Sequence, residues 1–198
     1  MKYLKLGNLN EPVSAIGVGC MRIAGMSSGQ LDRYVHTALD QGINFFDHAD
    51  IYASGKSEEI FGDLLSQEPS LRNRVILQSK CAIHDSMYDF SKDYILRSVD
   101  GILKRLKVSH LDSLLLHRPD ALMEPDEVEE AFQILKKSGK VLNFGVSNMN
   151  RYQMEFLGDR LSDSLAVNQL QMSAAHTPLI DAGINVNMMN DSADIRDG

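Results

Sequence analysis

The feature that most constrains this chain is a regular alternation of apolar runs and helical patterns. The apolar runs return about every 30 residues, which is the size of one βα unit. Strands are predicted at residues 16–20, 43–47, 75–79, 111–116, 141–146 and 165–170, after an N-terminal β-hairpin at 1–16. Helices are predicted at residues 30–41, 57–65, 91–106, 125–138 and 151–158. This order, without a long linker, favours one α/β domain with a parallel sheet.

The length fits a single domain over residues 1–198. With 43% hydrophobic and 24% charged residues, the composition is typical of a globular protein. Six βα units do not close an eight-stranded barrel, and residues 182–198 are rich in Asn and Asp and are expected to form a loop. Two architectures therefore stay open: a six-stranded open sheet, or a barrel that lacks its last quarter.

Charge and cysteine content restrict the partners and the compartment. The net charge of −7 argues against binding to nucleic acid or to an anionic membrane. We find neither a secretory signal pattern nor an apolar stretch long enough to span a bilayer. Two cysteines, Cys20 and Cys81, cannot form a disulfide framework and are expected to be buried free thiols, which favours the reducing cytoplasm.

Chemically useful side chains follow successive predicted strands. Asp47, with Tyr52 just beyond it, follows the second strand, Lys80 follows the third and His117 follows the fourth. In a parallel barrel the C-terminal ends of the strands meet on one face. An acid, a phenol, an amine and an imidazole are therefore expected to share one pocket, which indicates proton transfer.

The role of each side chain follows from its chemistry. A free tyrosine has a pKa of about 10, which is too high for efficient proton exchange at neutral pH. An ammonium group beside it favours the phenolate, and Lys80 is placed to do this for Tyr52. Asp47 would keep that lysine charged and oriented, and His117 would hydrogen-bond a substrate oxygen. Each residue alone is more often structural; four at equivalent positions favour the functional interpretation.

Other motifs are incomplete. The stretch 54–57 resembles the end of a P-loop, but Asp50 stands where that motif needs a glycine. The glycines at 17 and 19 lack the third glycine of a dinucleotide fingerprint. Asp47, His48 and Asp50 suggest a metal site only weakly, because neighbouring strand residues point to opposite faces.

Longer patterns resemble the aldo-keto reductase family. They comprise residues 42–52, with Glu58, Glu59 and Gly62 following, and residues 111–119, 139–148 and 168–169. The resemblance covers essentially the whole chain. It implies a (β/α)₈ TIM barrel, here truncated after about strand six, that reduces aldehydes or ketones with a nicotinamide cofactor, usually NADPH.

The resemblance also assigns roles by position. Tyr52 is implied as the general acid, Lys80 and Asp47 tune it, and His117 orients the carbonyl. The implied cofactor-binding residues are Gly19, Cys20, Ser147, Asn148 and Gln169. The family often has threonine and tryptophan where this chain has His48 and Arg118, which affects substrate preference.

Two further expectations and two alternatives complete the interpretation. Because the family's last two βα units are absent, the isolated chain is expected to be inactive and to self-associate through open barrel edges. One alternative is a non-catalytic, cofactor-sensing regulatory protein of the same fold. The other is a barrel lyase or isomerase that uses Lys80 as a Schiff-base amine.

Overall fold

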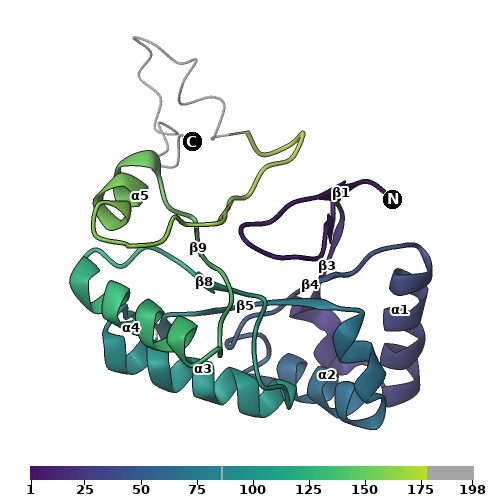
Figure 1. Cartoon of the computed structure of the whole chain (residues 1–198). Helices are drawn as coiled ribbons and strands as arrows, with labels where there is room; N and C mark the ends of the chain where they lie inside the picture. The colour runs from purple at the N-terminus through teal and green to yellow at the C-terminus, as the bar shows by residue number, and fades with distance from the viewer. Residues whose placement is uncertain (86, 178–198) are drawn as a thin grey trace.

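A six-stranded parallel sheet forms the centre of the molecule, and the strand order is β10-β9-β8-β5-β4-β3 (Figure 1). The structure is a computed structural model that describes residues 1–85 and 87–177. The strands are β3 (Gly17–Gly19), β4 (Phe45–Asp47), β5 (Ile76–Cys81), β8 (Ser113–Leu116), β9 (Phe144–Ser147) and β10 (Asn168–Gln169). The predicted parallel α/β order is therefore confirmed, and the predicted loop at 182–198 lies outside the described residues.

Helices α1 to α4 cover one face of this sheet (Figure 1). The helices are α1 (Ser28–Asp40), α2 (Lys56–Gln67), α3 (Lys92–Leu106), α4 (Pro125–Lys137) and α5 (Arg151–Gly158), with 3₁₀ turns η1 (Cys20–Gly25) and η2 (Pro69–Asn73). Capping boxes start α1 at Ser27 and α5 at Asn150. Helix α3 starts one residue after the predicted start at Ser91, which is its N-cap residue but makes no side-chain capping hydrogen bond.

The core lies between the sheet and the helices. Every residue of β5, β8 and β9 is buried, as expected for parallel strands covered on both faces. The same expectation is wrong for β3, where Gly17 and Gly19 are exposed. These glycines border a cavity of about 440 Å³ on the inner side of the sheet, so β3 is covered on its outer face only.

An N-terminal hairpin lies against the inner side of the sheet, opposite α1 to α4 (Figure 1). Strands β1 (Tyr3–Leu4) and β2 (Val13–Ser14) pair antiparallel, which confirms the predicted hairpin, although each strand is short. Gly7 in its loop has φ +51°, and an added Cβ there would overlap the Asn143 side chain. The backbone N–H of Asn8 donates to Asn143 Oδ1 at 2.8 Å. Glycine thus lets the hairpin approach the sheet closely.

Two features of the described chain concern its surface. A second, unpredicted hairpin is formed by β6 (Ile83–His84) and β7 (Met87–Tyr88), directly after β5. Within residues 1–85 and 87–177, no helix has both the length and the apolar character that crossing a bilayer requires.

Candidate active site

The C-terminal ends of β4, β5 and β8 bring the predicted catalytic side chains together. Asp47 is the last residue of β4, Lys80 is the penultimate residue of β5, and His117 directly follows β8. Tyr52 comes from the loop between β4 and α2. Parallel pairing of β4 with β5 and of β5 with β8 places these ends side by side.

The Lys80 ammonium group is the centre of this group. Its Nζ donates to both carboxylate oxygens of Asp47, each at 2.7 Å, and to the carbonyl oxygen of His48 at 2.9 Å. It also donates to the Tyr52 hydroxyl at 3.1 Å. Lys80 is only 1% exposed, so its charge is compensated almost entirely by these oxygens. The geometry fixes a cation next to the phenol.

His117 faces the same phenol from β8. The Tyr52 and His117 rings meet edge to face, with centroids 6.0 Å apart. Burial, followed by the positive charges of Lys80 and Arg118, lowers the pKa of His117 to about 4. The imidazole is therefore neutral near pH 7, and its Nδ1 is buried without a hydrogen-bond partner. A neutral imidazole can hydrogen-bond a ligand oxygen without adding charge.

Three of the predicted cofactor residues form a polar chain at the ends of β9 and β10. Ser147 Oγ donates to the Gln169 carbonyl oxygen at 2.9 Å, and Asn148 Nδ2 donates to Ser147 Oγ at 2.9 Å. Asn148 Nδ2 also lies 3.1 Å from the His117 carbonyl oxygen. The Gln169 amide donates to Asp47 Oδ2 at 3.2 Å. The structure thus brings these three residues next to Asp47 and His117.

Gly19 and Cys20 differ in whether they face the cavity or the core. Nothing lies within 4 Å of the position that a Cβ would take at Gly19, which lines the 440 Å³ cavity with Asp47, Gln78 and Gln169. The Cys20 thiol is fully buried in the core, donates weakly to Val18 O, and has its pKa raised mainly by burial. Gly19 therefore lines this cavity, whereas Cys20 does not.

The weak metal pattern at residues 47–50 does not converge. The Asp47 carboxylate points to Lys80, whereas the fully buried His48 ring packs edge-on against Phe61 of α2, with centroids 4.7 Å apart. Burial lowers the pKa of His48 to about 3, so this imidazole is neutral. Adjacent strand residues point to opposite faces, as the sequence predicted.

A buried ion pair behind the site was not assigned a role from sequence. Glu58 of α2 is fully buried, and its carboxylate accepts hydrogen bonds from Ser79 Oγ and Arg105 Nε. Burial raises the pKa of Glu58, and these two bonds oppose that shift. The available signal was an acidic residue on the same helical face as Phe61 and Leu65.

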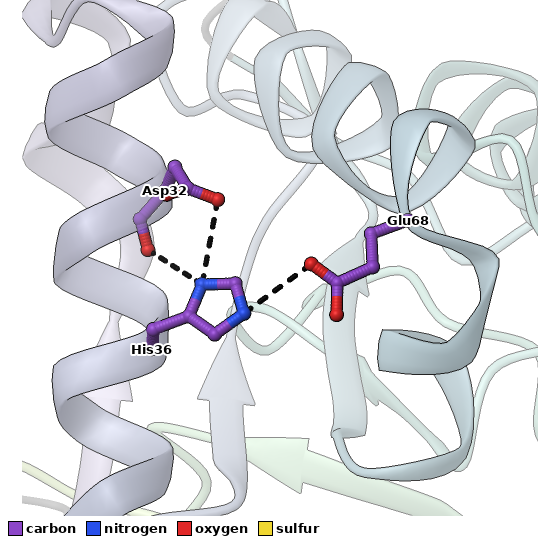
Figure 2. A group of neighbouring side chains, drawn as sticks. All are labelled: Asp32, His36 and Glu68. Atoms are coloured by element: carbon purple, nitrogen blue, oxygen red, sulfur yellow. Dashed lines mark hydrogen bonds and ion pairs between the residues drawn. The ribbon is translucent and has the colours of Figure 1, made fainter.

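A histidine between two carboxylates lies on the outer surface, away from the strand ends (Figure 2). His36 Nδ1 contacts the carbonyl oxygen of Asp32 at 3.0 Å, and its Nε2 lies 3.3 Å from Glu68 Oε2. The Asp32 carbonyl oxygen, and then the two carboxylates, raise the pKa of His36. In the described part of the chain this arrangement acts as an ion-pair contact between α1 and the end of α2.

Comparison with known proteins identifies the family. The sequence model of the Aldo/keto reductase family matches residues 15–195. The chain belongs to the aldo/keto reductase family. It is therefore a member of an oxidoreductase family, and the curved six-stranded sheet is part of the barrel of that family.

Individual relatives support this assignment. The chain is 42% identical over 163 residues to oxidoreductase YdhF from Escherichia coli K12, covering 78% of this chain and 55% of YdhF. It is 38% identical over 190 residues to a 6-dehydroglucose reductase from Novosphingobium aromaticivorans, covering 91% and 62%. This aldo/keto reductase chain therefore spans less than two thirds of these relatives.

Solved structures agree with the fold. The holo form of aldo-keto reductase AKR11C1 from Bacillus halodurans superposes with a TM-score of 0.76 at 30% identity, covering 87% of this chain and 58% of that one. Glycerol dehydrogenase AKR11B4 from Gluconobacter oxydans gives a TM-score of 0.75 at 29% identity, with 86% and 55% covered.

Proposed function

We propose that this chain carries the catalytic centre of an NADP(H)-dependent aldo-keto reductase that converts aldehydes or ketones to alcohols. The observation that supports this most directly is the hydrogen bond of 3.1 Å from Lys80 to the Tyr52 hydroxyl, with Asp47 holding the same ammonium group at 2.7 Å. Aldo-keto reductases generally use nicotinamide cofactors, and their chemistry needs a proton donor beside the reacting carbonyl.

The proposed proton donor is Tyr52. As negative charge develops on the carbonyl oxygen, the phenol gives up its proton, and the nearby Lys80 cation stabilises the phenolate left behind. His117, neutral at pH 7, is proposed to hydrogen-bond the carbonyl oxygen and orient it toward the phenol. Asp47 balances the charge of Lys80 and holds it in place.

The residues at the ends of β9 and β10 suit a nicotinamide. Ser147, Asn148 and Gln169 supply hydroxyl and amide groups that match the donors and acceptors of a carboxamide. The open space at Gly19 leaves room for a ring beside Asp47. A bound nicotinamide would supply the hydride, and these side chains would orient the ring. The Gln169 amide would exchange its bond to Asp47 for one to the cofactor.

Neither alternative is favoured. A Schiff-base amine must lose its proton and reach a carbonyl carbon, but Lys80 is 1% exposed and donates to three neighbouring residues. A purely regulatory protein would not need the arrangement of Asp47, Lys80 and Tyr52.

The two cysteines, Cys20 and Cys81, are buried free thiols. We therefore propose a reducing, cytoplasmic location for the protein.

Tyr52→Phe tests the proposed mechanism. In a chain extended by the last two βα units of a family member, we expect this variant to lower kcat for benzaldehyde by about 100-fold or more, as for loss of a general acid. NADPH binding, measured by fluorescence titration, should change little because the phenol proton is needed only during reaction.

A Tyr52→Phe variant with unchanged NADPH oxidation would refute the assignment of Tyr52. Covalent trapping of a carbonyl compound on Lys80 by borohydride would instead support the lyase alternative. NADPH binding without turnover in the extended wild-type chain would support the regulatory alternative.

A further inference from the structure

Tyr52 is carried by a strained loop. In the stretch that connects β4 to α2, Ala53, Ser54 and Gly55 have φ angles of 50°, 54° and 87°. The left-handed conformation costs a residue with a side chain roughly 1–2 kcal/mol. Such a loop keeps its shape only where neighbouring elements hold it.

Glu58 connects this loop to the strand that carries Lys80. It lies in the first turn of α2, shortly after Tyr52, and is fully buried. Its Oε1 accepts a hydrogen bond from Ser79 Oγ at 2.6 Å, and Ser79 is the residue before Lys80 in β5. One carboxylate therefore links the helix that follows Tyr52 to the strand position next to Lys80.

Arg105 of α3 completes this connection, and three glycines make room for it. Its Nε donates to Glu58 Oε2 at 2.7 Å. A Cβ at Gly55 would lie 2.7 Å from the Arg105 Cδ, and one at Gly101 would lie 3.1 Å from its Nη1. A Cβ at Gly62 would overlap the Arg105 carbonyl oxygen. Glycines on α2, on α3 and in the loop thus allow the guanidinium group to reach Glu58.

Stability alone is a weak reason for such a pair. Removing both charges from water costs several kcal/mol per ion, and apolar replacements of buried pairs are often as stable. The pair instead constrains geometry, because its directional hydrogen bonds fix the orientation of α2 relative to β5 and α3. The elements fixed in this way are those that set the distance between the Lys80 Nζ and the Tyr52 hydroxyl.

We propose that Glu58 and Arg105 are positioning residues that hold the Tyr52 loop against β5 and thereby set the contact between Lys80 and Tyr52. The proposal rests on the proposed function only for its catalytic consequence. In a catalytically active, extended chain, Glu58→Gln should lower kcat about tenfold or more with little change in KM, because small misplacements of a reacting group are costly.

The contact itself is measured on this chain without turnover. NMR with ¹³Cζ-labelled tyrosine and ¹⁵Nζ-labelled lysine reports on both atoms, with signals assigned by Tyr52→Phe and Lys80→Met. Glu58→Gln and Arg105→Met should shift the Tyr52 and Lys80 signals. Arg105→Lys keeps a cation near Glu58 and should shift them less.

Asp112→Asn is a matched control. Asp112 is also buried and also pairs with an arginine, but at the opposite end of β5: its Oδ2 accepts from the Leu77 backbone N–H at 2.7 Å and from Arg72 at 3.0 Å. We expect this variant to lose stability while both signals stay in place.

The outcomes separate the two proposals. If Glu58→Gln lowers thermal stability as Asp112→Asn does, but leaves both NMR signals unchanged, the positioning role is refuted. If the signals move but an extended wild-type chain reduces no carbonyl, the proposed function fails and the positioning role stands.

Discussion

Asp50, two residues before Tyr52, has an unusual carboxyl group. Burial, together with the negative charge of Glu58, raises the pKa of Asp50 to about 7 against the opposing effect of Arg105. One of its oxygens, Oδ1, is buried without a hydrogen-bond partner. The protonated form is therefore the one that the folded protein favours below about pH 7.

This carboxyl group should make stability depend on pH. An aspartate has a pKa near 3.8 when unfolded, so the folded state binds the proton more tightly, and its contribution to stability is lost as the pH rises from about 4 through 7. Asp50→Asn cannot lose a proton. Between pH 4 and pH 8 we therefore expect the stability of wild type to fall relative to that of the variant, by about 4 kcal/mol at most. Urea denaturation at both pH values measures this. The same difference in free energy of unfolding between wild type and variant at pH 4 and pH 8 would contradict it.

The residues proposed to perform chemistry were easier to bring together from the sequence than the residues proposed to position them. Asp47, Lys80 and His117 each lie at or next to the C-terminal end of a strand, and one rule about parallel strands places them on one face. Glu58 and Arg105 meet through the packing of α2 against α3, and no sequence interval encodes that contact. Cys20 and Cys81 were expected to be buried free thiols, and the structure confirms this for both.

At the scale of elements, the closest approach of α2 and α3 depends on Gly62. A Cβ there would overlap the backbone of Arg105 and Leu106, which cannot move aside as a flexible side chain can. We expect Gly62→Ala to lower the free energy of unfolding by about 2–3 kcal/mol, despite the better helix propensity of alanine. Gly29→Ala is the control, since its Cβ would meet only Arg33 Nη1 at 3.9 Å. Chemical denaturation measures the free energy of unfolding of both variants. Equal values for Gly62→Ala and Gly29→Ala would show that α2 and α3 can separate without cost.

The contact of His36 with Asp32 and Glu68 should act only at low pH. Because its folded pKa is raised, its contribution is fully present below the unfolded value near 6.5 and is lost as the pH rises through the folded value. The side chains are partly exposed, so we expect His36→Gln to cost no more than about 0.5 kcal/mol at pH 5.5. At pH 8.5 the cost should vanish. Scanning calorimetry at both pH values tests this, and the same loss at each would indicate packing rather than charge.

The periodicity of apolar residues predicts the bounds of some helices and strands better than others. Helix α5 has its predicted bounds, because capping residues and a terminal glycine mark both ends. Strand β10 keeps only two of the six residues predicted for it, since it has a hydrogen-bonded neighbour on one side only in the described chain. The hairpin of β6 and β7 has two-residue strands, which are too short to show any alternation.

At the scale of the whole molecule, the two edge strands of the sheet lead us to expect self-association in solution. In the part of the chain that the structure describes, β3 and β10 each pair with one strand only. Unpaired backbone groups on such edges favour association with another chain. We propose that the 198-residue protein self-associates, is inactive in an NADPH-oxidation assay, and elutes from a size-exclusion column well above its mass of 22.1 kDa. A compact monomer that reduces an aldehyde at ordinary reductase rates would contradict this.

The order of the strands has a consequence for how the protein is made. From β4 to β10, every strand of the central sheet pairs with the strand that precedes it in that sheet along the chain. A ribosome adds about 5–20 residues per second, so one βα unit of about 30 residues appears every few seconds. Local helix and loop formation is far faster than that. Each unit can therefore dock on the edge left by the unit before it while the next is still being translated.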